Sequence, residues 1–333
     1  MTVLFNVLDV EKSYVVGSTP SKRWLVAPEP KRLKALDGVR LEVEEGDAIA
    51  LVGESGSGKS TLVRLMLGLE GATDGRILYR QTDLQTMDRQ ARKQLAREVA
   101  FIYQDARGSM NPRMRIGQIL AEPMLLHALC SAAEAGEQVA RLLERVGLPA
   151  QFADRYPSEL SGGQVRRVAV ARALAAQPRV IIADESVAGL DVSVQAQLLN
   201  LLRSLCREMG LTLIFVTHDL GVASYLCERV AVMYLGRIIE SGPTATILSD
   251  PIHPYTRALM RAFPSFGRPL NASLTGEIPS PINLPAGCRF ASRCPEVRAR
   301  CHEADPTLAV QAPDRRAACW FPLTAPLRPQ SIS

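Results

Sequence analysis

Apolar runs of strand length alternate with amphipathic, helix-length stretches between about residues 35 and 240. The clearest runs are DAIALVG at 47–53 and RVIIAD at 179–184, and each is long enough for one buried strand. Strand and helix signals that alternate along a chain are typical of layered α/β folds. The pattern therefore predicts an α/β architecture for this part of the chain.

The alternating pattern stops near residue 250, where prolines become frequent and a group of cysteines follows. We therefore predict one large domain over residues 1–250 and a small, irregular, cysteine-rich extension over 251–333, with a disordered tail after Pro322. A second irregular stretch, GSTPSKRWLVAPEPKRLK at 17–34, is basic, rich in proline and without periodicity. It predicts a surface loop inserted near the N-terminus.

Composition places the chain among ordinary globular proteins. A chain of 333 residues suffices for about two domains, and 47% of its residues are hydrophobic and 22% charged. No apolar run approaches the roughly 20 residues that span a bilayer, and MTVLFNVLDVEKSY lacks the basic start of a secretory signal, so we expect a cytoplasmic location. The formal charge of +5 is interleaved with acidic residues, which gives little support to a nucleic-acid partner.

A phosphate-binding pattern follows the first of these apolar runs. GESGSGKS at 53–60 fits G-x-x-x-x-G-K-[ST] and joins a predicted strand to a predicted amphipathic helix. Glycines in such a loop let successive backbone amides turn toward a phosphate at the helix N-terminus. Lys59 is expected to reach the β and γ phosphates, and Ser60 to bind Mg²⁺. The residues expected at the nucleotide are Gly53, Ser55, Gly56, Ser57, Gly58, Lys59, Ser60 and Thr61.

Two acidic residues end the second apolar run, RVIIADES. Asp184 at the end of the strand can bind Mg²⁺ through water, and Glu185 can polarise a nucleophilic water beside the γ-phosphate. An acidic pair at a strand end is commonly only solvated, but the phosphate loop in the same chain favours the catalytic interpretation.

LSGGQVRRVAVARAL at 160–174 supplies a second predicted helix N-terminus, in which Ser161, Gly162 and Gly163 precede a helix that starts near Gln164. With the phosphate loop, this segment resembles the ATPase subunits of ATP-binding cassette transporters, whose signature is LSGGQ. The resemblance implies a P-loop nucleotide-binding domain with a RecA-like core and antiparallel β and helical subdomains. It also implies ATP and Mg²⁺ as cofactors, and a signature that contacts ATP on a partner cassette.

Further residues match this family one by one. Gln104 in FIYQD resembles the Q-loop glutamine that contacts Mg²⁺ and water, and Asp191 in AGLD resembles the D-loop aspartate. His218 in IFVTHD resembles the switch histidine at the γ-phosphate, and Tyr14 in EKSY the aromatic residue that stacks on adenine.

The C-terminal part narrows the resemblance to a subfamily. DPIHPYTRALM at 250–260 and GEIPSPINLPAGCRFASRCPEVRARC at 276–301 are similar to the extension of oligopeptide, dipeptide and nickel importer ATPases. That likeness implies two permease subunits, a second ATPase subunit, an indirect periplasmic solute-binding protein, and a site on the cytoplasmic face of the inner membrane. A heterodimer is expected and a homodimer stays open, as does the solute. We expect HPY at 253–255 to be a simple turn without chemistry.

Four cysteines in this extension form a candidate metal site: Cys288, Cys294, Cys301 and Cys319. Disulfides are rare in the cytoplasm, and structural zinc usually shows a C-x₂₋₄-C pair, which is absent here. The spacing favours an iron–sulfur cluster, and the family resemblance implies [4Fe–4S], while zinc or unliganded thiols remain alternatives. Cys130, Cys206 and Cys227 lie in apolar helical patterns and are expected to be buried packing residues.

Two other functions compete with an importer ATPase. Soluble cassette ATPases that act on DNA or ribosomes carry long coiled coils or tandem cassettes, and the sequence shows neither sustained heptads nor a second phosphate loop. A small-molecule P-loop kinase would lack the signature and the Asp191 and His218 matches.

Overall fold

The computed structural model describes residues 2–16, 31–186, 189, 191–262 and 276–324. By its internal contacts the chain divides into two compact units. Unit 1 comprises Met1–Thr2, Glu44–Ala48 and Met87–Val216, and unit 2 comprises Val3–Val43, Ile49–Thr86 and Thr217–Ser333. The predicted division at residue 250 stays a prediction. None of the helices in the described ranges is long and apolar enough to cross a membrane.

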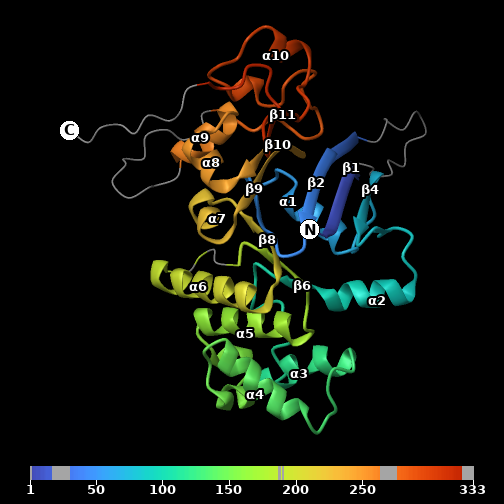
Figure 1. Ribbon diagram of the computed structural model, residues 1–333, viewed down its shortest axis with the longest axis vertical. Helices are drawn as coiled ribbons and strands as arrows, with labels where there is room; N and C mark the ends of the chain where they lie inside the picture. The colour runs from blue at the N-terminus through green and yellow to red at the C-terminus, as the bar shows by residue number, and fades with distance from the viewer. Residues whose placement is uncertain (1, 17–30, 187–188, 190, 263–275, 325–333) are drawn as a thin grey trace, which may run out of the picture. The chain divides into compact units, whose positions relative to one another are not determined.

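Unit 1 contains three parallel strands, β6 (Val99–Ile102), β7 (Val180–Asp184) and β8 (Thr212–Thr217), with β7 in the middle. All three are almost entirely buried, as expected for parallel strands covered on both faces. The other elements are α2 (Arg89–Glu98), α3 (Ile116–Leu126), α4 (Ala135–Arg145), η1 (Ala150–Asp154), η2 (Pro157–Glu159), α5 (Gly162–Ala175) and α6 (Val192–Met209). Helices α3, α4 and α5 pack against one another (Figure 1). The predicted α/β class is confirmed.

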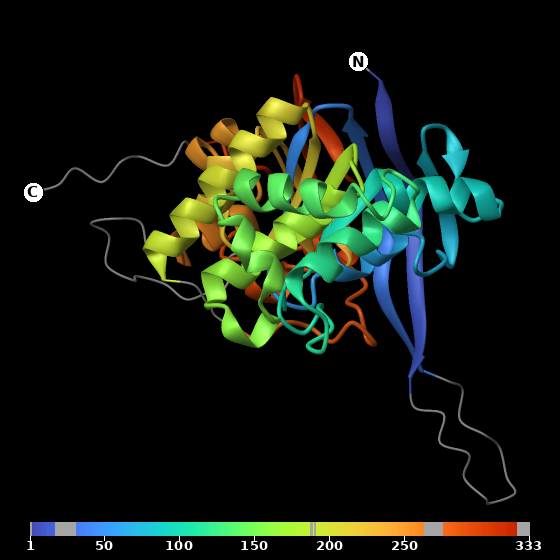
Figure 2. The ribbon, with the colours of Figure 1, turned by 90° about the horizontal axis from the view of Figure 1, so that it is seen from below.

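One sheet of unit 2 has the strand order β2-β1-β4-β5. Its strands are β1 (Val3–Val16), β2 (Lys31–Glu44), β4 (Asp74–Tyr79) and β5 (Thr82–Asp83). Strands β1 and β2 run side by side (Figure 2). The predicted surface loop at 17–34 lies outside the described residues from 17 to 30. Its last part, 31–34, is wrong as a loop because these residues begin β2 in the ladder beside β1.

The remaining strands of unit 2 are neighbours in the order β11-β12-β10-β9-β3. They are β3 (Ala48–Val52), β9 (Arg229–Tyr234), β10 (Arg237–Pro243), β11 (Ala309–Ala312) and β12 (Arg315–Ala317). The helices are α1 (Lys59–Met66), α7 (Leu220–Leu226), α8 (Thr244–Ser249), α9 (Pro254–Ala262), η3 (Ala291–Arg293) and α10 (Arg300–Glu303). Because Glu240 on β10 pairs with Ala317 on β12, the cysteine-rich extension adds strands to the sheet that contains β3.

An aromatic cluster fills the core of unit 2 near the phosphate loop. The ring centroid of Tyr234 lies 4.6 Å from that of Tyr255 and 5.5 Å from that of Phe290, and all three side chains are fully buried. Each such pair contributes roughly 0.5–1.5 kcal/mol beyond the burial of its surface. Because these residues come from β9, α9 and the cysteine-rich segment, the cluster packs the extension against the strands beside the phosphate loop.

Candidate active site

The phosphate loop has the predicted strand–loop–helix form, since it connects β3 to α1, which begins at Lys59. Gly58 has a φ of +105°, and a Cβ there would lie 2.7 Å from the carbonyl oxygen of Ala35. A Cβ on Gly53 would lie 2.2 Å from the carbonyl oxygen of Met233. Glycine is therefore required at both ends of the loop, by backbone conformation at Gly58 and by space at both positions.

Lys59 points into the phosphate loop. Its side chain Nζ donates hydrogen bonds to the carbonyl oxygens of Gly53 at 2.7 Å and Glu54 at 2.9 Å, and to Ser57 Oγ at 3.4 Å. The lysine is only 7% exposed. Its amino group thus lies at the centre of the loop, where a bound phosphate can replace the carbonyl partners. Three neighbouring loop residues are exposed to solvent: Ser55, Gly56 and Ser60.

Tyr14 lies on β1 beside the start of α1. Its hydroxyl donates to Glu70 Oε2 at 2.6 Å, and Lys12 Nζ lies 5.1 Å from the centroid of its ring. Burial raises the pKa of Tyr14, the hydrogen bond with Glu70 raises it further, and the Thr61 hydroxyl opposes them. The structure therefore brings Tyr14 close to the last residue of the predicted nucleotide-binding set.

In unit 1, the acidic pair stands at the end of β7, as predicted. The backbone N–H of Glu185 donates to the carbonyl oxygen of Val216 at 2.9 Å, and Gln104 Nε2 donates to Glu185 Oε2 at 2.7 Å. Glu185 has a φ of +40°, which few residues other than glycine adopt. Such backbone strain costs of order 1 kcal/mol and concentrates at functional sites. Gln104, which follows β6, is thus brought together with Asp184 and Glu185 at the carboxyl ends of two neighbouring parallel strands.

The signature segment forms the N-terminus of α5. Ser161 is the N-cap residue: its Oγ accepts from Gln164 N at 3.3 Å, and Gln164 Oε1 accepts from Ser161 N at 3.0 Å. This reciprocal capping starts the helix at Gly162, two residues before the predicted start near Gln164. Gly163 is consequently helical, and a Cβ there would lie 2.8 Å from Val194 Cγ1.

Arginines connect the signature helix to the segment that follows Gln104, a feature that sequence reasoning missed. Arg107 Nη2 donates to the carbonyl oxygen of Leu160 at 2.7 Å, and Arg172 Nη1 on α5 donates to the carbonyl oxygen of Ser109 at 2.5 Å. The two bonds run in opposite directions between the same two segments. They fix Leu160, the first residue of the LSGGQ signature, and helix α5 relative to residues 105–110.

Asp191 and His218 stand at helix starts. Asp191 caps α6, where its Oδ1 accepts from Val194 N at 2.9 Å and from Ser193 Oγ at 2.7 Å, and these bonds, led by the one from Val194, lower the pKa of Asp191. His218 follows β8 and is exposed, and the next residue, Asp219, caps α7. His218 therefore lies between the carboxyl end of the parallel strand β8 and the N-cap of α7.

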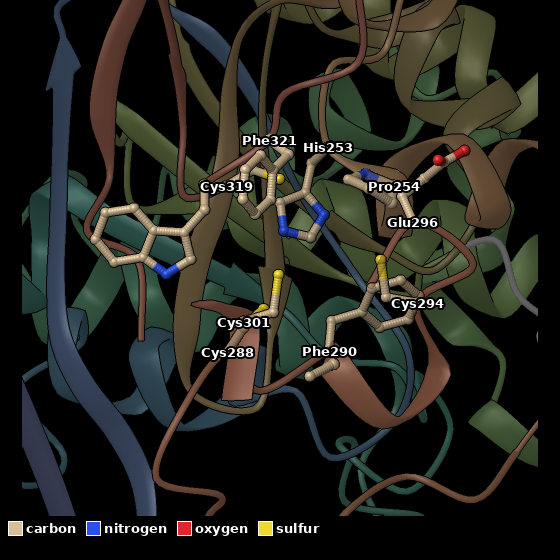
Figure 3. Close-up of a pocket in the computed structure, with 11 residues that line it drawn as sticks. His253, Pro254, Cys288, Phe290, Cys294, Glu296, Cys301, Cys319 and Phe321 are labelled. Atoms are coloured by element: carbon tan, nitrogen blue, oxygen red, sulfur yellow. The ribbon is translucent and has the colours of Figure 1, made fainter. Parts of the chain in front are cut away.

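The four cysteines of the extension line one pocket. Figure 3 shows the side chains of Cys288, Cys294, Cys301 and Cys319 around a shared hollow. Burial raises the pKa of Cys288 to about 12 and that of Cys319 to about 11, and it also raises the pKa of Cys294. These thiols are therefore protonated near neutral pH unless a metal replaces their protons. The other lining residues are His253, Pro254, Phe290, Ala291, Glu296, Trp320 and Phe321.

The expected simple turn at HPY is wrong. Pro254 is the first residue of α9, a position where its fixed φ and missing N–H cost nothing. His253 is 2% exposed, accepts a hydrogen bond at Nδ1 from Tyr255 N at 3.0 Å, and has its pKa lowered to about 3 by burial. Tyr255 is fully buried, and its hydroxyl accepts from the N–H of Glu54 in the phosphate loop at 3.0 Å.

The remaining cysteines differ from one another. Cys227 is buried at the C-terminal end of α7, as predicted. Cys206 lies on the predicted helix, α6, but is half-buried and not fully buried as expected; this partial burial raises its pKa to about 11. Cys130 is half-buried and lies beyond α3. The helical prediction for Cys130 is wrong because Ala128, with a φ of +52°, has already ended the helix.

Comparison with known proteins assigns this arrangement to a family. A family model described as "ABC transporter" matches residues 36–188, and one described as "Oligopeptide/dipeptide transporter, C-terminal region" matches residues 239–301. The chain is 44% identical to the dipeptide transport ATP-binding protein of Haemophilus influenzae over 96% of this chain and 97% of that protein. It is also 44% identical to the oligopeptide transport ATP-binding protein of Salmonella typhimurium, over 92% of each.

The chain belongs to the ATP-binding cassette family of transporter ATPases. Its fold agrees with this assignment: a dimeric ATP-binding cassette solved in a post-hydrolysis state with ADP and Pi matches with a TM-score of 0.63 and 28% identity. That match covers 72% of this chain and 99% of the solved cassette. A cassette of a transporter complex from Clostridium perfringens matches with a TM-score of 0.63 and 27% identity, over 74% of this chain and 91% of its own. The predicted cassette fold is confirmed.

Among the described residues of this cassette beyond position 250, Tyr255 and Arg293 contact Glu54 of the phosphate loop, and sequence analysis missed both. The Tyr255 hydroxyl accepts from the N–H of Glu54, as described above. Arg293 donates to the carboxylate of Glu54, from Nη1 to Oε2 at 2.8 Å and from Nη2 to Oε1 at 3.1 Å. The available signal was Glu54 itself, because a carboxylate repels a bound phosphate and a nearby cation offsets that repulsion.

Proposed function

We propose that this cassette is the ATP-hydrolysing subunit of a bacterial importer for dipeptides, oligopeptides or a related solute. The observation that carries the proposal is 44% identity, over nearly the whole of both chains, with a protein named for dipeptide transport. The match of residues 239–301 to an oligopeptide and dipeptide transporter region adds support. The subunit would act at the cytoplasmic face of the inner membrane, attached to two permease subunits that form the pore.

The proposed chemistry assigns a role to each polar residue. Lys59 and the amides of the phosphate loop hold the β and γ phosphates, and Ser60, Gln104 and Asp184 hold Mg²⁺. Glu185 acts as the general base toward water, and Tyr14 stacks on adenine. Support comes from the central position of the Lys59 amino group and from the bond between Gln104 and Glu185.

The proposed working assembly contains two cassettes. The signature of one, Ser161, Gly162, Gly163 and Gln164, would contact the ATP held by the phosphate loop of the other, with Asp191 at the shared boundary and His218 at the γ-phosphate. We propose a second, different ATPase subunit as the partner, and a periplasmic solute-binding protein that acts through the permeases. The exposed, capped N-terminus of α5 supports this arrangement, because its amides and dipole favour an anion.

Reconstitution tests this function. The chain, its partner ATPase and the permeases in proteoliposomes are expected to take up dipeptide only with ATP and the binding protein. Lys59→Ala should lower uptake and ATP hydrolysis at least about 100-fold, because the triphosphate loses its main cationic contact. Arg40→Ala, which removes an exposed pair with Asp9 on the sheet of β2, β1, β4 and β5, is the matched control, and a transporter with this variant should work normally. ATPase activity that responds to DNA or ribosomes instead of permeases would favour the soluble alternative.

We also propose that Cys288, Cys294, Cys301 and Cys319 bind a [4Fe–4S] cluster, with zinc as the alternative. Among the described residues no group of three or more His, Cys, Asp or Glu side chains is already placed to hold a metal ion, so the proposal rests on the four thiols that line one pocket. A larger cluster tolerates wider sulfur separations, and the pocket has mostly apolar walls. When bound, the cluster would crosslink four points of the extension.

Metal content tests the cluster. Protein purified without oxygen is expected to be brown and to carry about four irons per chain. Cys294→Ser should bleach it and lower the melting temperature, because a loop-rich segment depends on its metal for stability. Cys130→Ser, outside the pocket, should keep both colour and stability. One zinc in colourless protein would contradict the iron, and unchanged stability with all four cysteines replaced by serine would contradict any metal.

A further inference from the structure

The phosphate loop contains a negative charge of its own. Glu54 is the second residue of GESGSGKS, and its carbonyl oxygen accepts from Lys59 Nζ at 2.9 Å, so it lies beside the amine proposed to bind phosphate. Two like charges repel each other by an amount that grows as solvent is excluded. An unpaired carboxylate at this position would therefore oppose the binding of a triphosphate.

Every polar group of Glu54 makes a hydrogen bond. Its N–H donates to the Tyr255 hydroxyl, its carbonyl accepts from Lys59, and both carboxylate oxygens accept from Arg293. The Glu54 carbonyl also accepts from the N–H of Ser57 at 3.2 Å, and Tyr255 and Arg293 are the partners that come from the chain beyond residue 250. The extension thus fixes both the backbone and the charge of one residue in the phosphate loop.

The charged partner of Arg293 in the phosphate loop is Glu54. It ends η3, directly before Cys294, and its side chain is only 3% exposed, whereas that of Glu54 is 23% exposed. The Tyr234 hydroxyl lies 3.4 Å from Nη1, and the hydrogen bonds to Glu54 raise the pKa of Arg293. A two-pronged arginine–carboxylate contact with one partner buried is geometrically specific and resists screening by salt.

A second arginine of the same segment supports the other side of the loop. Arg289 is buried and donates to the carbonyl oxygen of Leu235 and to the carboxylate of Asp37. The next residue, Gly236, donates its N–H to the carbonyl oxygen of Ser57 at 2.9 Å. Arg289 therefore acts on the loop through backbone packing, and among these two arginines Arg293 contacts a charge of the loop directly.

We propose that Arg293 is a positioning residue for nucleotide: it neutralises Glu54 and so allows the phosphate loop to accept the charge of ATP. The inference rests on the proposed ATP site at this loop. It assigns to the cysteine-rich segment a part in nucleotide affinity that is separate from any metal. A purely structural anchor would instead affect all ligands of the site alike.

Nucleotide affinities of the full-length chain test the proposal. Arg293→Ala is expected to raise the Kd for Mg²⁺-ATP about tenfold at low salt, to raise that for ADP less, and to leave that for adenosine unchanged. The difference from wild type should shrink as ionic strength rises. Glu54→Gln should bind ATP at least as tightly as wild type, and Arg293→Met combined with Glu54→Gln should restore affinity, because no unpaired carboxylate remains.

The double variant Arg293→Met with Glu54→Gln keeps the test decisive even where Arg293→Ala fails to fold, because it leaves neither charge of the pair without its partner. Arg257→Ala is the matched control, because it breaks a different pair of the extension, with Glu296, and should leave affinity unchanged. A double variant as weak as Arg293→Ala, or equal losses for ATP and adenosine, would overturn the charge role. Lys59→Ala tests the ATP site separately from the role of Arg293, because normal ATP binding by that variant would overturn the proposed site at the phosphate loop.

Discussion

Glu185→Gln is expected to lower ATP turnover by the assembled transporter at least about 100-fold, because it removes the carboxylate that takes a proton from water. The substitution keeps the shape of the side chain, and the amide oxygen can still accept the hydrogen bond from Gln104 that is 2.7 Å long in the native protein. ATP affinity should therefore stay within about twofold of wild type. Steady-state hydrolysis checks the expected loss of turnover, and equilibrium nucleotide binding, measured on the same preparation, checks the unchanged affinity.

A blocked hydrolysis step has a further consequence that can be measured. The variant should accumulate with ATP bound and, if the proposed head-to-tail pair forms, should run as a closed dimer in the presence of ATP. Glu137→Gln on α4 is the matched control, since it makes the same chemical change in an exposed pair with Arg141. Hydrolysis by Glu185→Gln at near the wild-type rate would contradict the assignment of the base.

Local motifs could be predicted because their signals are local. The phosphate loop, the acidic strand end and the signature each combine a short spacing with the period of the adjoining strand or helix, and the structure forms those elements. The observed start of α5 differs from the predicted one because of capping: the reciprocal bonds between Ser161 and Gln164 start the helix at Gly162, two residues earlier than predicted.

Contacts between distant segments could not be predicted in this way. Arg293 and Glu54 are 239 residues apart, and Arg289 and Asp37 are 252 residues apart, so no periodicity relates them. Strand β12 is only three residues long and reads RRA, which has no apolar alternation, yet it pairs with β10. The turn expected at HPY failed for a related reason, because Tyr255 is buried by aromatic partners from elsewhere in the chain.

The second large effect is expected at the signature. Gly162→Asp places a carboxylate at the first residue of α5, where the partner's γ-phosphate is proposed to bind, and should lower hydrolysis at the partner's site at least about 100-fold. The helix should tolerate the change, because Gly162 is exposed and already has the helical conformation of α5, and an acidic residue in a first turn is favourable by roughly 0.3–1 kcal/mol. ATP binding to the chain's own phosphate loop should persist.

The chain offers a matched control for this substitution. Gly136→Asp makes the same change in the first turn of α4, at an exposed glycine where a Cβ would meet nothing within 4 Å. It should leave both binding and hydrolysis unchanged, so a loss confined to Gly162→Asp identifies the anion site at α5 as its cause. In a heterodimer, vanadate trapping should then fail at the partner's phosphate loop. Loss of ATP binding by the isolated Gly162→Asp chain would instead mean that the signature acts within one chain.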